Sequence, residues 1–200
     1  MELTFFTHTA MNRTYGESFI VYNPEYQELK IHSSSTKQKD GTIIKTPENA
    51  FVEVLPRQAA YAPAYNHLKE MVVVHTGLEL GATIYLDYSI ISKSGYLQEL
   101  DICQPIRQTS MVKDYIITLS VPENKPLTYS LTTMNVSPVV KTENGQKYVT
   151  WKLKQIKAAS HEPQTTGLNG DVAFLTATTY PSIKEALNTL RSQVSSSGDE

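Results

Sequence analysis

Cys103, the single cysteine of this 200-residue chain, is a candidate nucleophile. A reactive cysteine needs a helix N-terminus or a nearby histidine, because these lower the thiol pKa and generate the thiolate. Cys103 lies instead in the run Leu100–Pro105, which indicates an extended segment cut short by its proline. We therefore predict a structural thiol, buried as unpaired cysteines usually are.

The histidines do not form a metal-binding motif. No two of them stand four residues apart beside a carboxylate, the spacing typical of helical zinc sites. Whether His67 and His75 approach each other in space is left open by the sequence. The five positions are His8, His32, His67, His75 and His161. We expect no metal site, no cofactor-binding residue and no cofactor.

Four acidic residues on or near expected strands could in principle pair as a general acid and base. Carboxylates scattered along strands are more often solvated, outward-facing positions. Neither glycine-rich phosphate-binding fingerprint is present. We expect no catalytic residue in this chain, and the four acidic positions considered are Glu53, Glu70, Glu79 and Asp87.

The loop from Arg57 to His67 is the one stretch that favours recognition. Tyr61, Tyr65 and His67 alternate there with small residues, and prolines restrict the backbone. Such a loop presents aromatic side chains to a partner at a low ordering cost. The alternative is that the tyrosines plug one end of the fold, as packed aromatics commonly do. The candidate recognition residues are Arg57, Tyr61, Tyr65 and His67.

Composition excludes several function classes. A formal net charge of -2 and a pI of about 6.2 give no general attraction to nucleic acid. No apolar stretch approaches the roughly 20 residues that span a bilayer, so we expect no membrane span. The first residues, Met1–Phe6, lack the basic and apolar regions of a signal peptide.

Short apolar runs about ten residues apart predict a mostly β fold, an antiparallel β-sandwich. The clearest expected strand is 83–91, where apolar and polar side chains alternate. Asp40-Gly41 and Asn144-Gly145 each have the composition of a tight two-residue hairpin turn. No helices alternate with the strands, which argues against an α/β fold.

One C-terminal amphipathic helix is expected after the strands. Ser182 and Glu185 have the spacing of a capping box, and an apolar stripe with helical periodicity follows. We predict a sandwich domain over 1–160, a linker over 161–180, a helix over 181–194 and a disordered tail over 195–200. The stripe comprises Ile183, Ala186, Leu187, Leu190 and Val194.

The order of these features resembles the uncharacterised β domain that precedes transglutaminase-like domains in many exported bacterial proteins. The resemblance rests on the Asp40-Gly41 hairpin, the run Leu78–Tyr88, the strand Tyr148–Leu153, and Ala158 followed by Glu162-Pro163. It implies a β-sandwich located outside the cytoplasm and followed by a papain-like Cys-His-Asp domain. It carries over no catalytic or ligand-binding residue.

These observations lead to a hypothesis of function. We expect a non-catalytic accessory domain that scaffolds or recognises substrate for a downstream transglutaminase-like domain, or for another protein. The alternative is an independent carbohydrate- or peptide-binding module. The location in the periplasm or at the cell surface follows from the resemblance alone.

Overall fold

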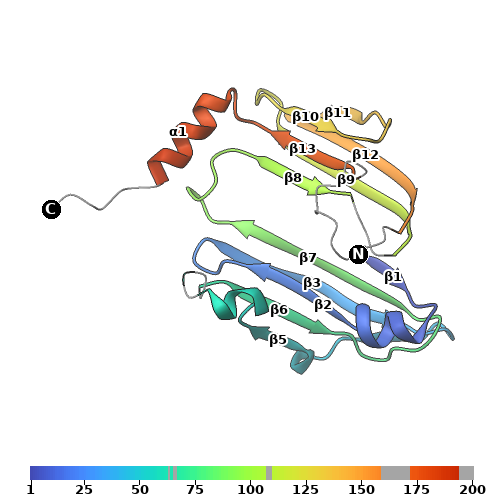
Figure 1. Cartoon of the computed structure of the whole chain (residues 1–200). Helices are drawn as coiled ribbons and strands as arrows, with labels where there is room; N and C mark the ends of the chain where they lie inside the picture. The colour runs from blue at the N-terminus through green and yellow to red at the C-terminus, as the bar shows by residue number, and fades with distance from the viewer. Residues whose placement is uncertain (63, 65–66, 107–109, 159–171, 194–200) are drawn as a thin grey trace. The chain divides into compact units, whose positions relative to one another are not determined.

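The computed structural model describes residues 1–62, 64, 67–106, 110–158 and 172–193 (Figure 1). They divide into two compact units, which we call unit 1 (Met1–Gln98) and unit 2 (Glu99–Glu200). Strands dominate both units, and every strand pairing among the described residues is antiparallel. The predicted fold class, mostly antiparallel β with one C-terminal helix, is confirmed.

Unit 1 contains two sheets. The four-stranded sheet has the order β1-β7-β3-β4 and the three-stranded sheet the order β2-β6-β5 (Figure 1). A π-helical turn, η1 (Ala10–Thr14), and two 3₁₀ turns, η2 (Glu48–Ala50) and η3 (Arg57–Tyr61), lie between strands. The strands are β1 (Glu2–Thr4), β2 (Glu17–Tyr22), β3 (Gln27–Lys37), β4 (Ile43–Lys45), β5 (Phe51–Val54), β6 (Lys69–Val74) and β7 (Thr83–Ser92).

The two sheets of unit 1 share a small core. Ile20 and Val73 come from the three-stranded sheet, and Leu86 comes from the four-stranded sheet. Alternation along each strand sends these side chains inward, because successive residues point to opposite faces. Four partly buried residues complete the cluster: Leu29, Ile31, Phe51 and Met71.

Unit 2 contains two three-stranded sheets, with the orders β10-β13-β8 and β11-β12-β9 (Figure 1). Both contribute to one core around Trp151, whose ring meets that of Tyr129 edge-on at a centroid distance of 5.1 Å. The elements are β8 (Asp101–Pro105), β9 (Val112–Pro122), β10 (Thr128–Leu131), β11 (Val139–Glu143), β12 (Gln146–Ile156), β13 (Phe174–Thr178) and α1 (Ile183–Gln193).

The two predicted hairpin turns differ in outcome. Asn144 and Gly145 both have positive φ angles (52° and 75°) and join β11 to β12, as their composition predicts. Between β3 and β4, only Gly41 has a positive φ, 93°. Gln38 instead donates its amide N–H to the Thr42 carbonyl, and the Asp40 carboxylate accepts the Thr42 amide N–H. The Asp40-Gly41 turn is therefore a longer loop than predicted.

The predicted domain over 1–160 stays a prediction, and its bounds span the division between the two compact units at Gln98/Glu99. Within the predicted linker 161–180, residues 174–178 are strand β13, the central strand of its sheet. Residues 159–171 and the predicted tail 195–200 lie outside the described residues. The predicted helix is confirmed as α1, and the Ser182 hydroxyl accepts the Glu185 amide N–H at 3.3 Å.

Candidate recognition surface and exposed helix

The predicted recognition loop begins at the end of β5 and contains η3. Pro56 and Ala59 are buried and anchor this turn against unit 1. Arg57 is exposed, and the Tyr61 side chain is 92% exposed. Burying an aromatic side chain in a core removes most of its surface from water. Tyr61 therefore does not plug the fold, which leaves it free for contact with a partner.

The other two predicted residues of the loop are less informative. His67 is exposed just before β6 begins at Lys69. Tyr65 lies outside the described residues. The structure thus places Arg57, Tyr61 and His67 on the connection between β5 and β6, and all three are solvent-accessible.

An apolar surface lies on the outer face of the three-stranded sheet β2-β6-β5, whose strands β5 and β6 this loop connects. The register aligns Phe19 on β2 with Val72 on β6 and Val52 on β5, so the three side chains form a row across the sheet. Phe19 is 56% exposed, and Val21, Val52 and Val54 on the same face are also exposed. We call Phe19, Val21, Val52 and Val54 the outer apolar face. Sequence reasoning missed this surface because the sequence of a strand does not show which of its two faces is buried.

Glu53 is part of an ion-pair network rather than an acid–base pair. Its carboxylate accepts hydrogen bonds from the Lys69 ammonium and the Tyr22 hydroxyl. The Lys69 contact, followed by that of Tyr22, lowers the pKa of Glu53. The hydrogen bond to Glu53 in turn raises the pKa of Tyr22 to about 12. A carboxyl held ionised in this way is a poor proton donor.

The remaining acidic candidates are not part of the hydrogen-bond network of Glu53 in the described residues. The Glu79 carboxylate accepts the Lys39 amide N–H at 2.7 Å. Asp87 is exposed on β7, and Glu70 lies on the same side of β6 as Val72. Among the residues the structure describes, no group of three or more His, Cys, Asp or Glu side chains could hold a metal ion.

His75 is buried next to Ser18. Its Nε2 lies 2.9 Å from the Ser18 hydroxyl, while its buried Nδ1 has no partner within the described part of the chain. Desolvation lowers the pKa of His75 and favours the neutral ring. A Ser–His contact resembles part of a nucleophilic pair, but the third group that would orient the histidine through Nδ1 is not among the described residues.

Cys103 differs from the prediction in one respect. It lies on β8, paired with Thr176 of β13, so the expected extended conformation is confirmed. The thiol is exposed, and the prediction that it is buried is wrong. β8 forms one edge of its sheet, where alternate side chains face solvent.

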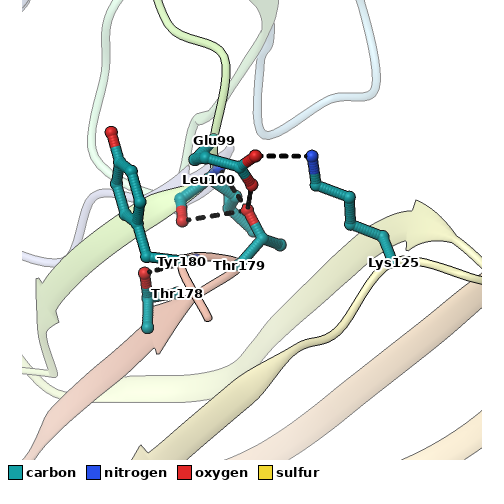
Figure 2. Close-up of polar contacts among 6 residues, drawn as sticks. All are labelled: Glu99, Leu100, Lys125, Thr178, Thr179 and Tyr180. Atoms are coloured by element: carbon teal, nitrogen blue, oxygen red, sulfur yellow. Dashed lines mark hydrogen bonds and ion pairs between the residues drawn. The ribbon is translucent and has the colours of Figure 1, made fainter. Parts of the chain in front are cut away.

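A polar cluster fixes the chain where it leaves β13 toward α1 (Figure 2). The buried Thr179 hydroxyl donates to the Glu99 carboxylate at 2.5 Å and accepts the Leu100 amide N–H at 2.8 Å. The other Glu99 oxygen accepts a hydrogen bond from the Lys125 ammonium at 2.7 Å. The Lys125 contact and then the Thr179 contact lower the pKa of Glu99. We call Glu99, Lys125 and Thr179 the Glu99 cluster.

The helix beyond this cluster exposes its apolar stripe. Ile183 is 81% exposed, and Leu187 and Leu190 are each 58% exposed. Ala186 is half-buried. An isolated helix of 11 residues is only marginally stable in water, so its apolar side chains normally need a packing partner. No helix in the described ranges is long and apolar enough to cross a membrane.

The fold and these surfaces define a two-unit β protein with an exposed C-terminal helix. The chain belongs to the family DUF3857, a domain of unknown function with solved structures, whose model matches residues 1–160. A comparison with curated proteins gave no match.

One solved structure is similar over nearly the whole chain. It is a crystal structure described as a "putative protease" from Parabacteroides distasonis, with 61% sequence identity and a TM-score of 0.90. The similarity covers 96% of this chain but 38% of that protein. This chain thus spans less than half the length of the protein it matches.

Proposed function

We propose that this chain is a non-catalytic accessory region of a longer enzyme whose catalytic domain is transglutaminase-like, with a papain-type Cys-His-Asp site. In this proposal unit 2 presents α1, and the catalytic region covers the stripe formed by Ile183, Leu187 and Leu190. The exposure of that stripe is the observation that carries the proposal.

Two further observations support it. The Glu99 cluster holds the residues just before α1, so the helix starts from a fixed point rather than from a loose tail. The similar "putative protease" is much longer than the matched region, and papain-type domains catalyse peptide hydrolysis. A location outside the cytoplasm belongs to the same proposal and rests on the family resemblance.

The test uses the longer chain that the proposal requires, in which the catalytic domain is present. We would replace Leu187 and Leu190 by aspartate and compare this variant with one carrying aspartate at Asn188 and Thr189. Burial of each leucine against a catalytic domain is worth about 1.5–3 kcal/mol, so the stripe variant should lose much of its hydrolytic activity or thermal stability. The control variant should retain both. Equal behaviour of the two variants would contradict the proposal.

An independent binding module is the second candidate, favoured by the exposed Tyr61 and the outer apolar face. Exposed aromatic rings commonly contact sugar rings or peptide side chains. A glycan array separates the two functions. A free-standing carbohydrate-binding module binds a defined sugar and loses that binding on Tyr61→Ala, whereas an accessory scaffold binds none.

A further inference from the structure

The longest strand of unit 1, β3, is only partly covered by its neighbours. Along one edge it pairs with β7 from Gln27 to Lys37. Along the other edge, β4 pairs only with residues 35–37. The Ser34 carbonyl accepts one further hydrogen bond, from the Thr46 amide. Residues 27–33 therefore have no strand partner on the β4 side among the described residues.

The pairing of β7 with its two neighbours shows in which direction the backbone N–H and C=O groups of β3 point. The Leu86 amide N–H donates to the Met1 carbonyl, so Leu86 faces β1 and the odd-numbered residues of β7 face β3. Ser89 is opposite Lys30, and Ile91 is opposite Glu28. The backbone N–H and C=O groups of Lys30 and Glu28 therefore point toward β7.

The intervening residues must then face outward. Antiparallel strands alternate the direction of successive N–H and C=O groups. The N–H and C=O groups of Leu29 and Ile31 consequently point toward the uncovered edge, which we call the free edge of β3. A register irregularity between Ile31 and Ser33 ends this segment at His32. An exposed row of this kind is a template for another extended chain.

A groove lies beside residues 31–35 of β3 and meets the free edge at Ile31. Its volume is about 470 Å³, within the range of small binding pockets. Ile31, Phe51 and Met71 supply apolar surface, and these side chains also pack against the core of unit 1. The remaining lining residues are His32, Ser33, Ser34, Ser35, Ile43, Lys45 and Thr46. Most of these are polar, so an apolar pocket is bordered by hydrogen-bonding groups.

We propose that an extended peptide binds unit 1 by adding a strand to the free edge of β3. Its main chain pairs with Leu29 and Ile31, and one apolar side chain of leucine or phenylalanine size enters the groove beside Ile31. Unsatisfied main-chain groups in a row favour a peptide over a sugar, since a peptide offers matching donors and acceptors at the strand repeat. This inference does not depend on the proposed docking of α1.

Capped octapeptides of alternating threonine and serine provide defined probes, with leucine, phenylalanine, alanine or aspartate at the fourth position. In the free chain, amide exchange by NMR should be fast at Leu29 and Ile31 and slow at Glu28 and Lys30. The leucine and phenylalanine peptides should bind with dissociation constants below about 1 mM. Binding should slow exchange at Leu29 and Ile31 selectively.

Two matched variants locate the site. Ser34 is opposite the buried Leu86, so its side chain lies on the same face of β3 as Ile31. Ser34→Trp therefore places a large ring in the groove and should weaken peptide binding about tenfold or more. Ser92→Trp adds the same ring to an exposed position at the end of β7, outside the groove, and should leave binding unchanged. The proposal is overturned if no probe binds, if binding leaves exchange at Leu29 and Ile31 unchanged, or if both variants bind equally. Pairing of this edge with a second copy, detected as a dimer by light scattering, would also overturn it.

Discussion

The two units of this molecule differ in how completely they bury their apolar side chains. Among the described residues, one cluster of unit 2 contains nine buried residues, Trp151 included, whereas the corresponding cluster of unit 1 contains three. The buried side-chain polar atoms that lack a partner in the described residues, on Thr36, His75 and Thr76, all belong to unit 1. Unit 1 also carries the outer apolar face and the free edge of β3.

This contrast suggests a division of roles. A tightly packed core resists deformation, which suits a unit that must hold α1 in place. Exposed apolar side chains and unpaired strand edges are costly unless a partner covers them, which suits a unit that makes contacts. We therefore regard unit 2 as the rigid frame that presents α1, and unit 1 as the unit that offers the outer apolar face and the free edge of β3. The predictions below test this difference.

The largest effect is expected in the core of unit 2. Replacing Trp151 by alanine removes a fully buried side chain and should lower the free energy of unfolding of unit 2 by about 3–5 kcal/mol. Hydrogen exchange of peptides from β9 and β12 during urea unfolding measures this loss. Tyr61→Ala serves as the control, with an expected change of less than about 0.5 kcal/mol. Similar losses for the two variants would refute the assignment of unit 2 as the frame.

A smaller effect is expected at the Glu99 cluster. Thr179→Val leaves the Glu99 carboxylate without its hydroxyl donor and the Leu100 amide without an acceptor. Leaving such groups unpaired should cost about 1–3 kcal/mol in urea denaturation. Thr176→Val, at an exposed position on β13, the strand that ends just before Thr179, should be nearly neutral. A neutral Thr179→Val would mean that the cluster does not fix the exit toward α1.

His75 predicts a pH dependence confined to unit 1. Burial holds its pKa below the ordinary value of 6.5, so below that pH the unfolded chain binds more protons than the folded chain. The stability contributed by the neutral ring is therefore complete above pH 6.5 and decreases as the pH falls toward the folded pKa. His75→Gln should flatten the stability profile of unit 1 between pH 7.5 and about pH 5. A profile as steep in this variant as in the original chain would contradict the prediction.

The smallest effect is expected on α1 in this chain. The stripe leucines are already largely exposed, so changing Leu187 and Leu190 to aspartate should alter the free energy of unfolding by less than about 0.5 kcal/mol. Urea denaturation of the 200-residue chain measures it. A loss above 2 kcal/mol would show that the stripe is already packed here.

Much of the fold could be predicted because local patterns and tertiary burial agree. Alternation at 83–91 predicts β7, and Asn144-Gly145 predicts the turn between β11 and β12. Strand β13 was missed although Ala173, Leu175 and Ala177 alternate as buried residues. The glycine- and threonine-rich segment before it obscured that short alternation, and only pairing with β8 and β10 makes it a strand.

The candidate surfaces were less predictable. The exposure of Tyr61 depends on how Pro56 and Ala59 anchor η3, which no local pattern encodes. The free edge of β3 depends on the short length of β4 and on the register with β7. Both are tertiary properties, because the same residues would be covered if a neighbouring strand were longer.

We propose that a further domain covers the apolar stripe of α1, and amide exchange tests this most directly. Exchange over residues 183–191 should be compared with that over β7, in this chain as a verified monomer and in the longer chain, with a catalytic domain, that the proposal requires. We expect fast exchange of the helix here and protection close to that of β7 in the longer chain. Protection of the helix equal to that of β7 already in the 200-residue monomer would contradict the account.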